Sequence, residues 1–125
     1  MFIQDILYQR GPQMNYIIIN KIFKKMAILV KTHKTYRLII AVCDCDIIGK
    51  HFEQGNKQLD LKKDFYEGDK KDDADVIELL KNAQRDDATF NIVGKNSVNA
   101  AIKAGIVSKK GIMKIQGIPY ALCLL

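Results

Sequence analysis

The chain is short, basic and nearly half hydrophobic: it has 125 residues, a formal net charge of +6, 48% hydrophobic residues and only 2 Pro. This length suits one domain with one hydrophobic core, and the composition excludes an overall disordered or fibrous chain. No apolar run reaches the roughly 20 residues that span a bilayer, and residues 1–8 lack the basic start of a signal peptide. We therefore expect a cytoplasmic protein without a membrane partner.

The first 25 residues differ in pattern from the rest. Gly11-Pro12 interrupts them, and the apolar run 16–23 leads directly to Met26, where the first regular strand pattern begins. We predict that residues 1–25 are an N-terminal extension, which is a misassigned start, a disordered segment or an extra element packed on the domain. Residues 26–125 are then a single globular domain.

The domain begins with two predicted strands. Residues 27–32 (AILVKT) and 36–42 (YRLIIAV) are rich in Ile, Leu and Val, and His33-Lys34 makes a short polar turn between them. Because neither strand alternates cleanly, at least one is expected to be buried on both faces.

A short helix is predicted next. Asp44 is a suitable N-cap, Ile47, Ile48 and Phe52 supply an apolar stripe, and Gly55 suits the C-terminal end. Residues 57–61 then alternate as a short strand.

The polar stretch 67–75 is predicted to be a surface loop, with Asp73 or Asp75 capping a helix that continues to Arg85. Residues 89–93 form a predicted buried strand. A third helix, capped at Asn96 or Ser97, closes at Gly105.

The last predicted elements are strands over 112–115 and 120–124, the latter at a sheet edge, joined by the turn Gly117-Ile118-Pro119. The predicted order is β-β-α-β-α-β-α-β-β. This order indicates an α/β or α+β domain with about three short helices packed on a mixed sheet.

Three cysteines are too few for a disulfide scaffold and one ligand short of a four-cysteine zinc site. Cys43, Asp44, Cys45 and Asp46 nevertheless place two thiols and two carboxylates at the end of a predicted buried strand, where ligands often bind. A metal site would need another ligand such as His33, and a catalytic thiol would need a basic neighbour. We favour packed thiols with Asp44 as a cap, and expect no metal or cofactor.

The positive charge is concentrated in two acid-free blocks. Residues 20–40 carry six bases, and residues 88–125 carry five lysines, whereas residues 60–87 hold ten acids against six bases. The acid-free blocks could converge into one positive face that binds a phosphate backbone, or they could serve solubility alone. Dropping residues 1–25 would lower the net charge to +3 and weaken the first alternative.

Two motifs are relevant to nucleic-acid binding. In residues 91–97 (NIVGKNS) a strand, a glycine, Lys95 and a helix start could offer amides and an ammonium to one phosphate, although the full phosphate loop of nucleotide hydrolases is missing. Phe65-Tyr66 could stack on a base or anchor a loop on the core.

Taken together, several segments resemble the small archaeal family known as domain of unknown function 424. They are Ala41-Val42-Cys43-Asp44, Ile47-Ile48-Gly49-Lys50 with Phe52, Leu59-Asp60-Leu61, Phe65-Tyr66-Glu67-Gly68, Asn91-Ile92-Val93-Gly94, Val98 with Ala101-Ile102 and Gly105, and Gly117-Ile118-Pro119. The resemblance covers residues 26–121 and favours a natural start at Met26. Where relatives have His-Ala after the last proline, this chain has Tyr120-Ala121, which disfavours acid–base catalysis there.

The resemblance implies a cytoplasmic RNA-binding protein without enzymatic activity, linked to the ribosome, transfer RNA or translation. A protein–protein adaptor that uses the acidic loop is the alternative, and a thiol- or metal-dependent enzyme at Cys43, Asp44 and Cys45 ranks third. The partner expected from these alternatives is an RNA, a ribonucleoprotein or another protein. The expected RNA contacts are Lys50, Asn91, Lys95, Lys103, Lys109, Lys110 and Lys114, together with the aromatic residues Phe65, Tyr66 and Tyr120.

Overall fold

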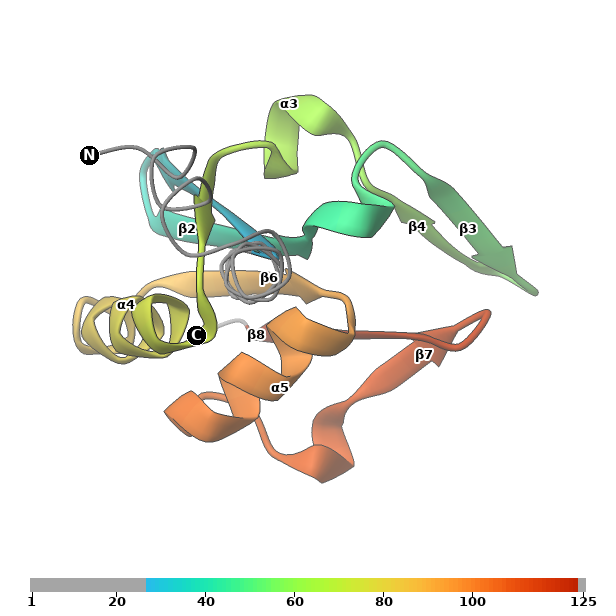
Figure 1. Ribbon diagram of the computed structural model, residues 1–125. Coiled ribbons are helices and arrows are strands. Elements are labelled where there is room, and N and C mark those ends of the chain that lie inside the picture. Colours follow the sequence, from blue (N-terminus) through green and yellow to red (C-terminus); the bar gives the residue numbers. More distant parts are fainter. Residues whose placement is uncertain (1–26, 124–125) are drawn as a thin grey trace, which may run out of the picture.

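The computed structural model describes residues 27–123, so the predicted extension over residues 1–25 lies outside the described residues. Its centre is a six-stranded mixed sheet with the strand order β5-β1-β2-β6-β8-β7 (Figure 1). Strand β2 pairs with β6 in parallel, and the other neighbouring pairs of this sheet are antiparallel. The strands are β1 (Ile28–Lys34), β2 (Leu38–Asp44), β5 (Asp69–Lys71), β6 (Thr89–Val93), β7 (Met113–Ile115) and β8 (Ile118–Cys123).

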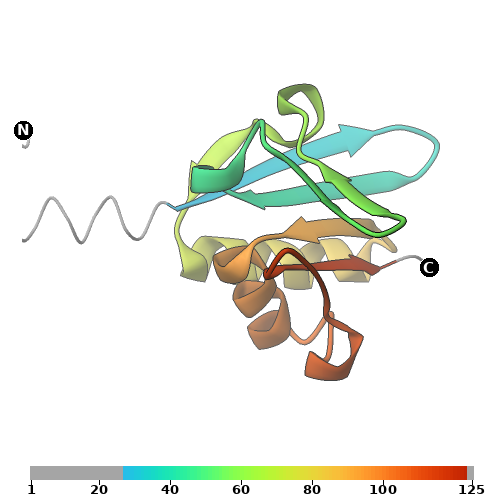
Figure 2. The ribbon, with the colours of Figure 1, turned by 90° about the vertical axis from the view of Figure 1, so that its right-hand side faces the viewer.

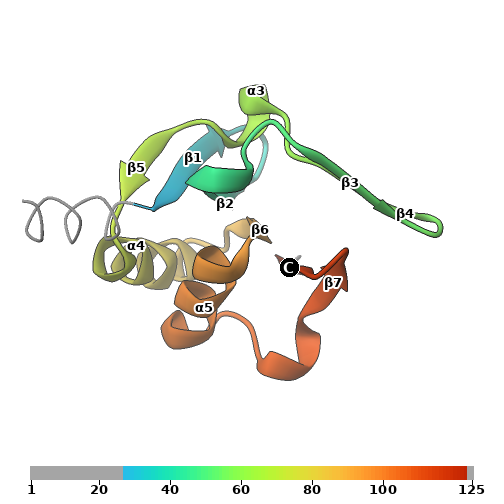
Figure 3. The same cartoon turned by 45° about the vertical axis from the view of Figure 1, so that its right-hand side comes forward.

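Two helices cover one face of the sheet. They are α4 (Asp73–Arg85) and α5 (Lys95–Ala104), which lie below the sheet in Figure 3. Ile40 and Val42 of β2 and Ile92 of β6 point into this layer and pack with Leu80 of α4. Their alternation follows from the two-residue period of a strand.

The other face is covered by smaller elements. These are the turn η1 (Cys45–Ile47), the hairpin of β3 (His51–Gln54) and β4 (Lys57–Asp60), and the short helix α3 (Lys63–Tyr66). Ala41 and Cys43, which alternate with the helix-facing residues of β2, pack here with Leu61. Because β2 is buried on both faces, its sequence is continuously apolar, as predicted. Figure 2 shows the two layers on either side of the sheet.

The predicted fold class is confirmed, but the predicted helix that starts at Asp44 is wrong. Only the single turn η1 forms, and residues 51–60 make the β3–β4 hairpin instead. Gly55, expected to end a helix, has a positive φ of 61° and forms with Asn56 the two-residue turn between Gln54 and Lys57. A Gly-Asn pair with positive φ at its first position is typical of hairpin turns.

The predicted loop 67–75 is also more ordered than expected. It contains β5 and the start of α4, which is capped by Asp72 rather than by Asp73 or Asp75. Gly68 allows the chain to pass β1 closely, since a Cβ there would lie 2.1 Å from the carbonyl oxygen of Val30. A side chain at this position would prevent the close approach that precedes β5.

Two boundary predictions change as well. His33 and Lys34 belong to β1, and the turn falls on residues 35–37. The final strand is not an edge strand, because β8 lies between β6 and β7. Strand β7 takes the edge position, opposite β5 across the sheet.

Candidate functional site: a charged cleft at the start of helix α5

The candidate site is a cleft of about 380 Å³ at the carboxyl ends of β2 and β6. Asp44 and Asp46 line it from the end of β2, Gly94 and Lys95 from the start of α5, and Lys114 and Gly117 from β7 and the turn after it. Parallel neighbours end at the same edge of a sheet, which is where sheets of this type commonly place ligands. The cleft therefore combines carboxylates and ammonium groups at a favourable position for binding.

Asp44 forms the floor of the cleft and caps α5 from a distance. Its side chain is 3% exposed. Oδ1 accepts hydrogen bonds from the backbone N–H of Ser97 at 2.8 Å and from the Ser97 hydroxyl at 2.6 Å, and Oδ2 accepts one from the N–H of Asn96 at 3.0 Å. Burial raises the pKa of Asp44 above its ordinary value, while these three donors act in the opposite direction. Asp44 thus does what a local N-cap does for other helices.

This arrangement corrects the prediction that the first amides of the helix hold a phosphate. The amides of Asn96 and Ser97 already donate to the Asp44 carboxylate, and the amide of Val98 donates to the carbonyl of Gly94. The predicted caps Asn96 and Ser97 are helical residues, and α5 begins at Lys95. The amides of Asn96, Ser97 and Val98 are therefore not free for a ligand, and the cleft offers it the side chains of Lys95 and Lys114.

Gly94 is required by the same contact. Its φ is 111°, and a Cβ there would lie 2.4 Å from Cγ of Asp44. Only glycine combines that backbone conformation with so close an approach. Gly94 is one of the residues on which the family resemblance rests, and its contact with the Asp44 cap explains why glycine occupies this position.

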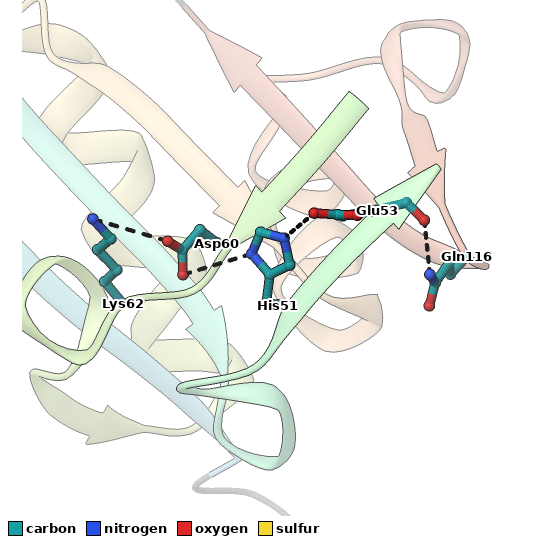
Figure 4. Close-up of polar contacts among 5 residues, drawn as sticks. All are labelled: His51, Glu53, Asp60, Lys62 and Gln116. Atoms are coloured by element: carbon teal, nitrogen blue, oxygen red, sulfur yellow. Dashed lines mark hydrogen bonds and ion pairs between the residues drawn. The ribbon is translucent and has the colours of Figure 1, made fainter. Parts of the chain in front are cut away.

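The β3–β4 hairpin is hydrogen-bonded to Gln116, the residue before Gly117 of the cleft; Figure 4 shows the contact of Gln116 with Glu53. Gln116 precedes that glycine, and its side-chain amide donates to the carbonyl of Glu53 at 2.7 Å while its backbone N–H donates to Oε1 of Gln54 at 2.7 Å. On the hairpin itself, His51 lies 2.9 Å from a carboxylate oxygen of Glu53 and 4.0 Å from one of Asp60. Lys62 extends this exposed row, 3.9 Å from Asp60.

The two cysteines at the end of β2 are unlike reactive thiols. Cys43 is fully buried, and burial, reinforced by Asp44, raises its pKa from 9.0 to about 12. Burial also raises the pKa of Cys45. A thiol must ionise to act as a nucleophile or metal ligand, so these pKa shifts oppose both roles.

Neither histidine is placed to assist the thiols. Across the β1–β2 pair, Cys43 lies opposite Leu29 whereas His33 lies opposite Ile39. His33 hydrogen-bonds the carbonyl of Phe65 at 2.8 Å, and His51 pairs with Glu53. Within residues 27–123, no group of three or more His, Cys, Asp or Glu side chains is arranged to hold a metal ion.

The aromatic residues expected to contact bases are packed into the fold. Tyr66 and Tyr120 are 8% and 7% exposed, and burial raises the pKa of Tyr66 to about 12. Phe65 stacks on His33 with ring centroids 4.6 Å apart and contacts Tyr66 edge-on. Stacking needs an open ring face, so the base-contact prediction for Tyr66 and Tyr120 is incompatible with their burial. The Phe65-Tyr66 pair instead anchors α3 on the sheet, the other alternative stated above.

An exposed aromatic residue that the sequence analysis missed is Tyr36, in the β1–β2 turn, whose side chain is fully exposed. The predicted turn at His33-Lys34 begins two residues before the observed one, so the sequence pattern puts Tyr36 inside a strand. It lies just before β2, whereas the cleft lies at the other end of that strand.

The structure places the predicted polar contacts in different parts of the fold. Lys95 and Lys114 line the cleft together, and Lys103, Lys109 and Lys110 are exposed on α5 and on the turn η2 (Lys109–Gly111) that follows it. Lys50 is exposed but belongs to the segment before β3. Asn91 is half-buried within β6, between Phe90 and Ile92, which face the helices, so its side chain is on the opposite face.

The fold and the cleft define an α/β protein in which a distant aspartate caps the helix after the parallel strand pair. The chain belongs to the family described as "Protein of unknown function (DUF424)", whose model matches residues 32–124. No curated protein matches the chain. It is similar in structure to an uncharacterized conserved protein from Methanopyrus kandleri, with 21% sequence identity and a TM-score of 0.69 over 76% of this chain and 88% of that one. This likeness supports the fold. Among residues 27–123 no helix is long and apolar enough to cross a membrane.

Proposed function

We propose that this protein binds RNA through a basic face made of five exposed lysines on α5, η2 and β7. The basic face consists of Lys95, Lys103, Lys109, Lys110 and Lys114. Figure 1 shows α5, the turn after it and β7 following one another along the lower part of the molecule. The cytoplasmic location expected from the reduced cysteines suits such a partner.

The observation that carries this proposal is the complete absence of acidic residues from 88–125. None of the five lysines forms an ion pair with another residue of the described part of the chain, 27–123. Lysines kept only for solubility are usually interspersed with acids, as they are in residues 60–87. Unpaired ammonium groups on one contiguous segment instead favour a polyanion, because binding releases its condensed counterions.

The adaptor alternative has less support. Asp72 of the acidic stretch accepts the N–H of Asp75 at 2.8 Å and thereby caps α4. Part of that stretch is also strand β5, paired with β1. Several of its residues therefore already have a structural use.

The test is the salt dependence of binding to single-stranded RNA, measured by fluorescence anisotropy. Three variants test the basic face: Lys114→Ala on edge strand β7, and Lys95→Ala and Lys103→Ala on α5. The control for the strand variant is Lys70→Ala, on the opposite edge strand β5. The control for the two helix variants is Lys81→Ala on α4. Each basic-face variant should flatten the slope of log affinity against log salt by about one, and the controls should leave it nearly unchanged.

Thermal melting should be nearly unaffected in all five variants, because exposed lysines make few packing contacts. Equal losses from test and control variants would mean that only net charge attracts RNA. No RNA binding at low salt would overturn the proposal. Sequencing of RNA crosslinked to the protein then distinguishes ribosomal from transfer RNA.

A further inference from the structure

We infer that the cleft beside α5 holds one ribonucleotide of the bound strand and that Asp46 recognises its 2′-hydroxyl group. This inference rests on the proposed function, since it assigns the part of the RNA that enters the cleft. It would make the protein selective for RNA over DNA.

The inference begins with three charged side chains that line one cleft without pairing. Lys95, Lys114 and Asp46 are all exposed, and none of them forms an ion pair or a hydrogen bond with another side chain of residues 27–123. In contrast to Asp44, whose oxygens accept three hydrogen bonds, Asp46 is available to a ligand. Asp46 is therefore an exposed carboxylate with free acceptor oxygens in the cleft that two lysines of the basic face, Lys95 and Lys114, also line.

A carboxylate beside a basic face needs a chemical reason, because it repels the phosphates that the lysines attract. The repulsion is offset if the ligand presents a hydrogen-bond donor near each phosphate. A ribose 2′-hydroxyl is such a donor, and acidic side chains bind ribose hydroxyls in dinucleotide sites. The same hydroxyl distinguishes RNA from DNA.

The shape of the cleft suits a single nucleotide. A volume of about 380 Å³ lies at the lower end of small-molecule sites. Gly94 and Gly117 provide walls without side chains, and Ile118 and Pro119 supply an apolar surface for a base or sugar. The two lysines would then hold the flanking phosphates.

The experiment compares a short single-stranded RNA with its 2′-deoxyuridine counterpart, for the wild type, Asp46→Ala and Asp46→Asn. The wild type should prefer RNA by about tenfold, the value of one charge-assisted hydrogen bond. Asp46→Ala should bind RNA more weakly and DNA more tightly, so that the preference falls to about one. Asp46→Asn keeps a neutral carbonyl acceptor and should retain about a threefold preference, because a neutral hydrogen bond has roughly half the free energy of a charge-assisted one.

Asp69→Ala is the matched control, because Asp69 is an exposed aspartate on β5 at the far edge of the sheet. It should leave the RNA preference unchanged. A free nucleoside monophosphate should displace the RNA only weakly, since one phosphate engages few of the lysines; displacement at low concentration would contradict binding of a strand.

The outcomes separate this inference from the proposed function. If Asp46→Ala changes RNA and DNA binding by the same factor, Asp46 acts only through its charge and the inference is wrong while RNA binding stands. If the wild type binds neither nucleic acid at low salt, the proposed function itself fails. Thermal melting of each variant verifies that the fold is intact.

Discussion

Helices α4 and α5 lie on the same face of the sheet, yet their first turns are completed in different ways (Figure 3). At α4, Asp72 accepts the N–H of Asp75, three residues later. At α5, the acceptor is Asp44, which precedes Ser97 by 53 residues and lies at the end of strand β2. The local cap stabilises one helix, whereas the distant cap also joins α5 to the end of β2.

The difference assigns distinct roles to the two aspartates. Asp72 is partly exposed, so water can replace it at modest cost. Asp44 is buried, and water cannot easily reach the Ser97 hydroxyl and the two amides that depend on it. The wall of the cleft that contains Lys95 is therefore positioned by a buried hydrogen-bond network.

The largest effect is expected for Asp44→Ala. It leaves buried donors without an acceptor, and we expect a loss of about 3 kcal/mol in the free energy of unfolding. Chemical denaturation measures it. Asp44→Asn, which keeps one acceptor oxygen, should lose clearly less; equal losses would show that the hydrogen bonds are not what stabilises α5.

Gly94→Ala tests the close contact beneath the same helix. The positive φ of 111° and the clash with Asp44 should together cost about 2 kcal/mol. In the double variant with Asp44→Ala the contacts with Cγ and Oδ1 of Asp44 are removed and only the one with Cβ, at 2.8 Å, remains, so the double variant should lose less stability than the sum of the two single losses. Strict additivity in this cycle would contradict the contact.

Alkaline pH should lower the free energy of unfolding through Cys43, the neighbour of Asp44 at the end of β2. The Cys43 thiol ionises at about pH 9 in the unfolded chain but keeps its proton to about pH 12 in the fold. Its contribution to stability is therefore complete below pH 9 and is lost as the pH rises toward 12, by about 1.4 kcal/mol per pH unit.

In Cys43→Ala the free energy of unfolding should fall less steeply as the pH rises. The variant is also less stable at neutral pH, because the substitution leaves a small cavity. The comparison is between slopes of unfolding free energy against pH, which the cavity does not change. Burial also raises the pKa of Tyr66 to about 12, which adds its own alkaline loss; that loss is smaller in the variant, because the charge of Cys43 contributes to the pKa shift of Tyr66. Identical slopes would mean that Cys43 ionises freely in the fold.

The smallest effect is expected for Asp72→Ala, at about 1 kcal/mol, because α4 loses one exposed local cap. Denaturant unfolding of Asp73→Ala, an exposed neighbour in the first turn, provides the control and should change stability by only a few tenths of a kcal/mol. If Asp72→Ala proved as costly as Asp44→Ala, the contrast between the two helices would fail.

The sequence by itself determined the elements whose signals are local. The apolar runs of β1 and β2, the strand over residues 89–93, the apolar positions of α4, and Gly105 at the end of α5 all appear where their neighbours predict them. The acid-free lysine segment is likewise a property of the sequence. These features follow from propensities and patterns that act within a few residues.

Only the tertiary structure decided which distant residues meet. Residues 44–55 resemble a helix when taken alone, but the apolar face offered by the sheet accepts Leu59 and half-buried Phe52 from a hairpin. Tyr120, predicted to contact a base, is buried because it belongs to the apolar cluster that includes Leu61 and Ile115. Asp44 looked like a local cap and became the cap of α5, because a buried carboxylate is satisfied by whichever donors the fold brings to it, and those donors are 52 and 53 residues away in the chain.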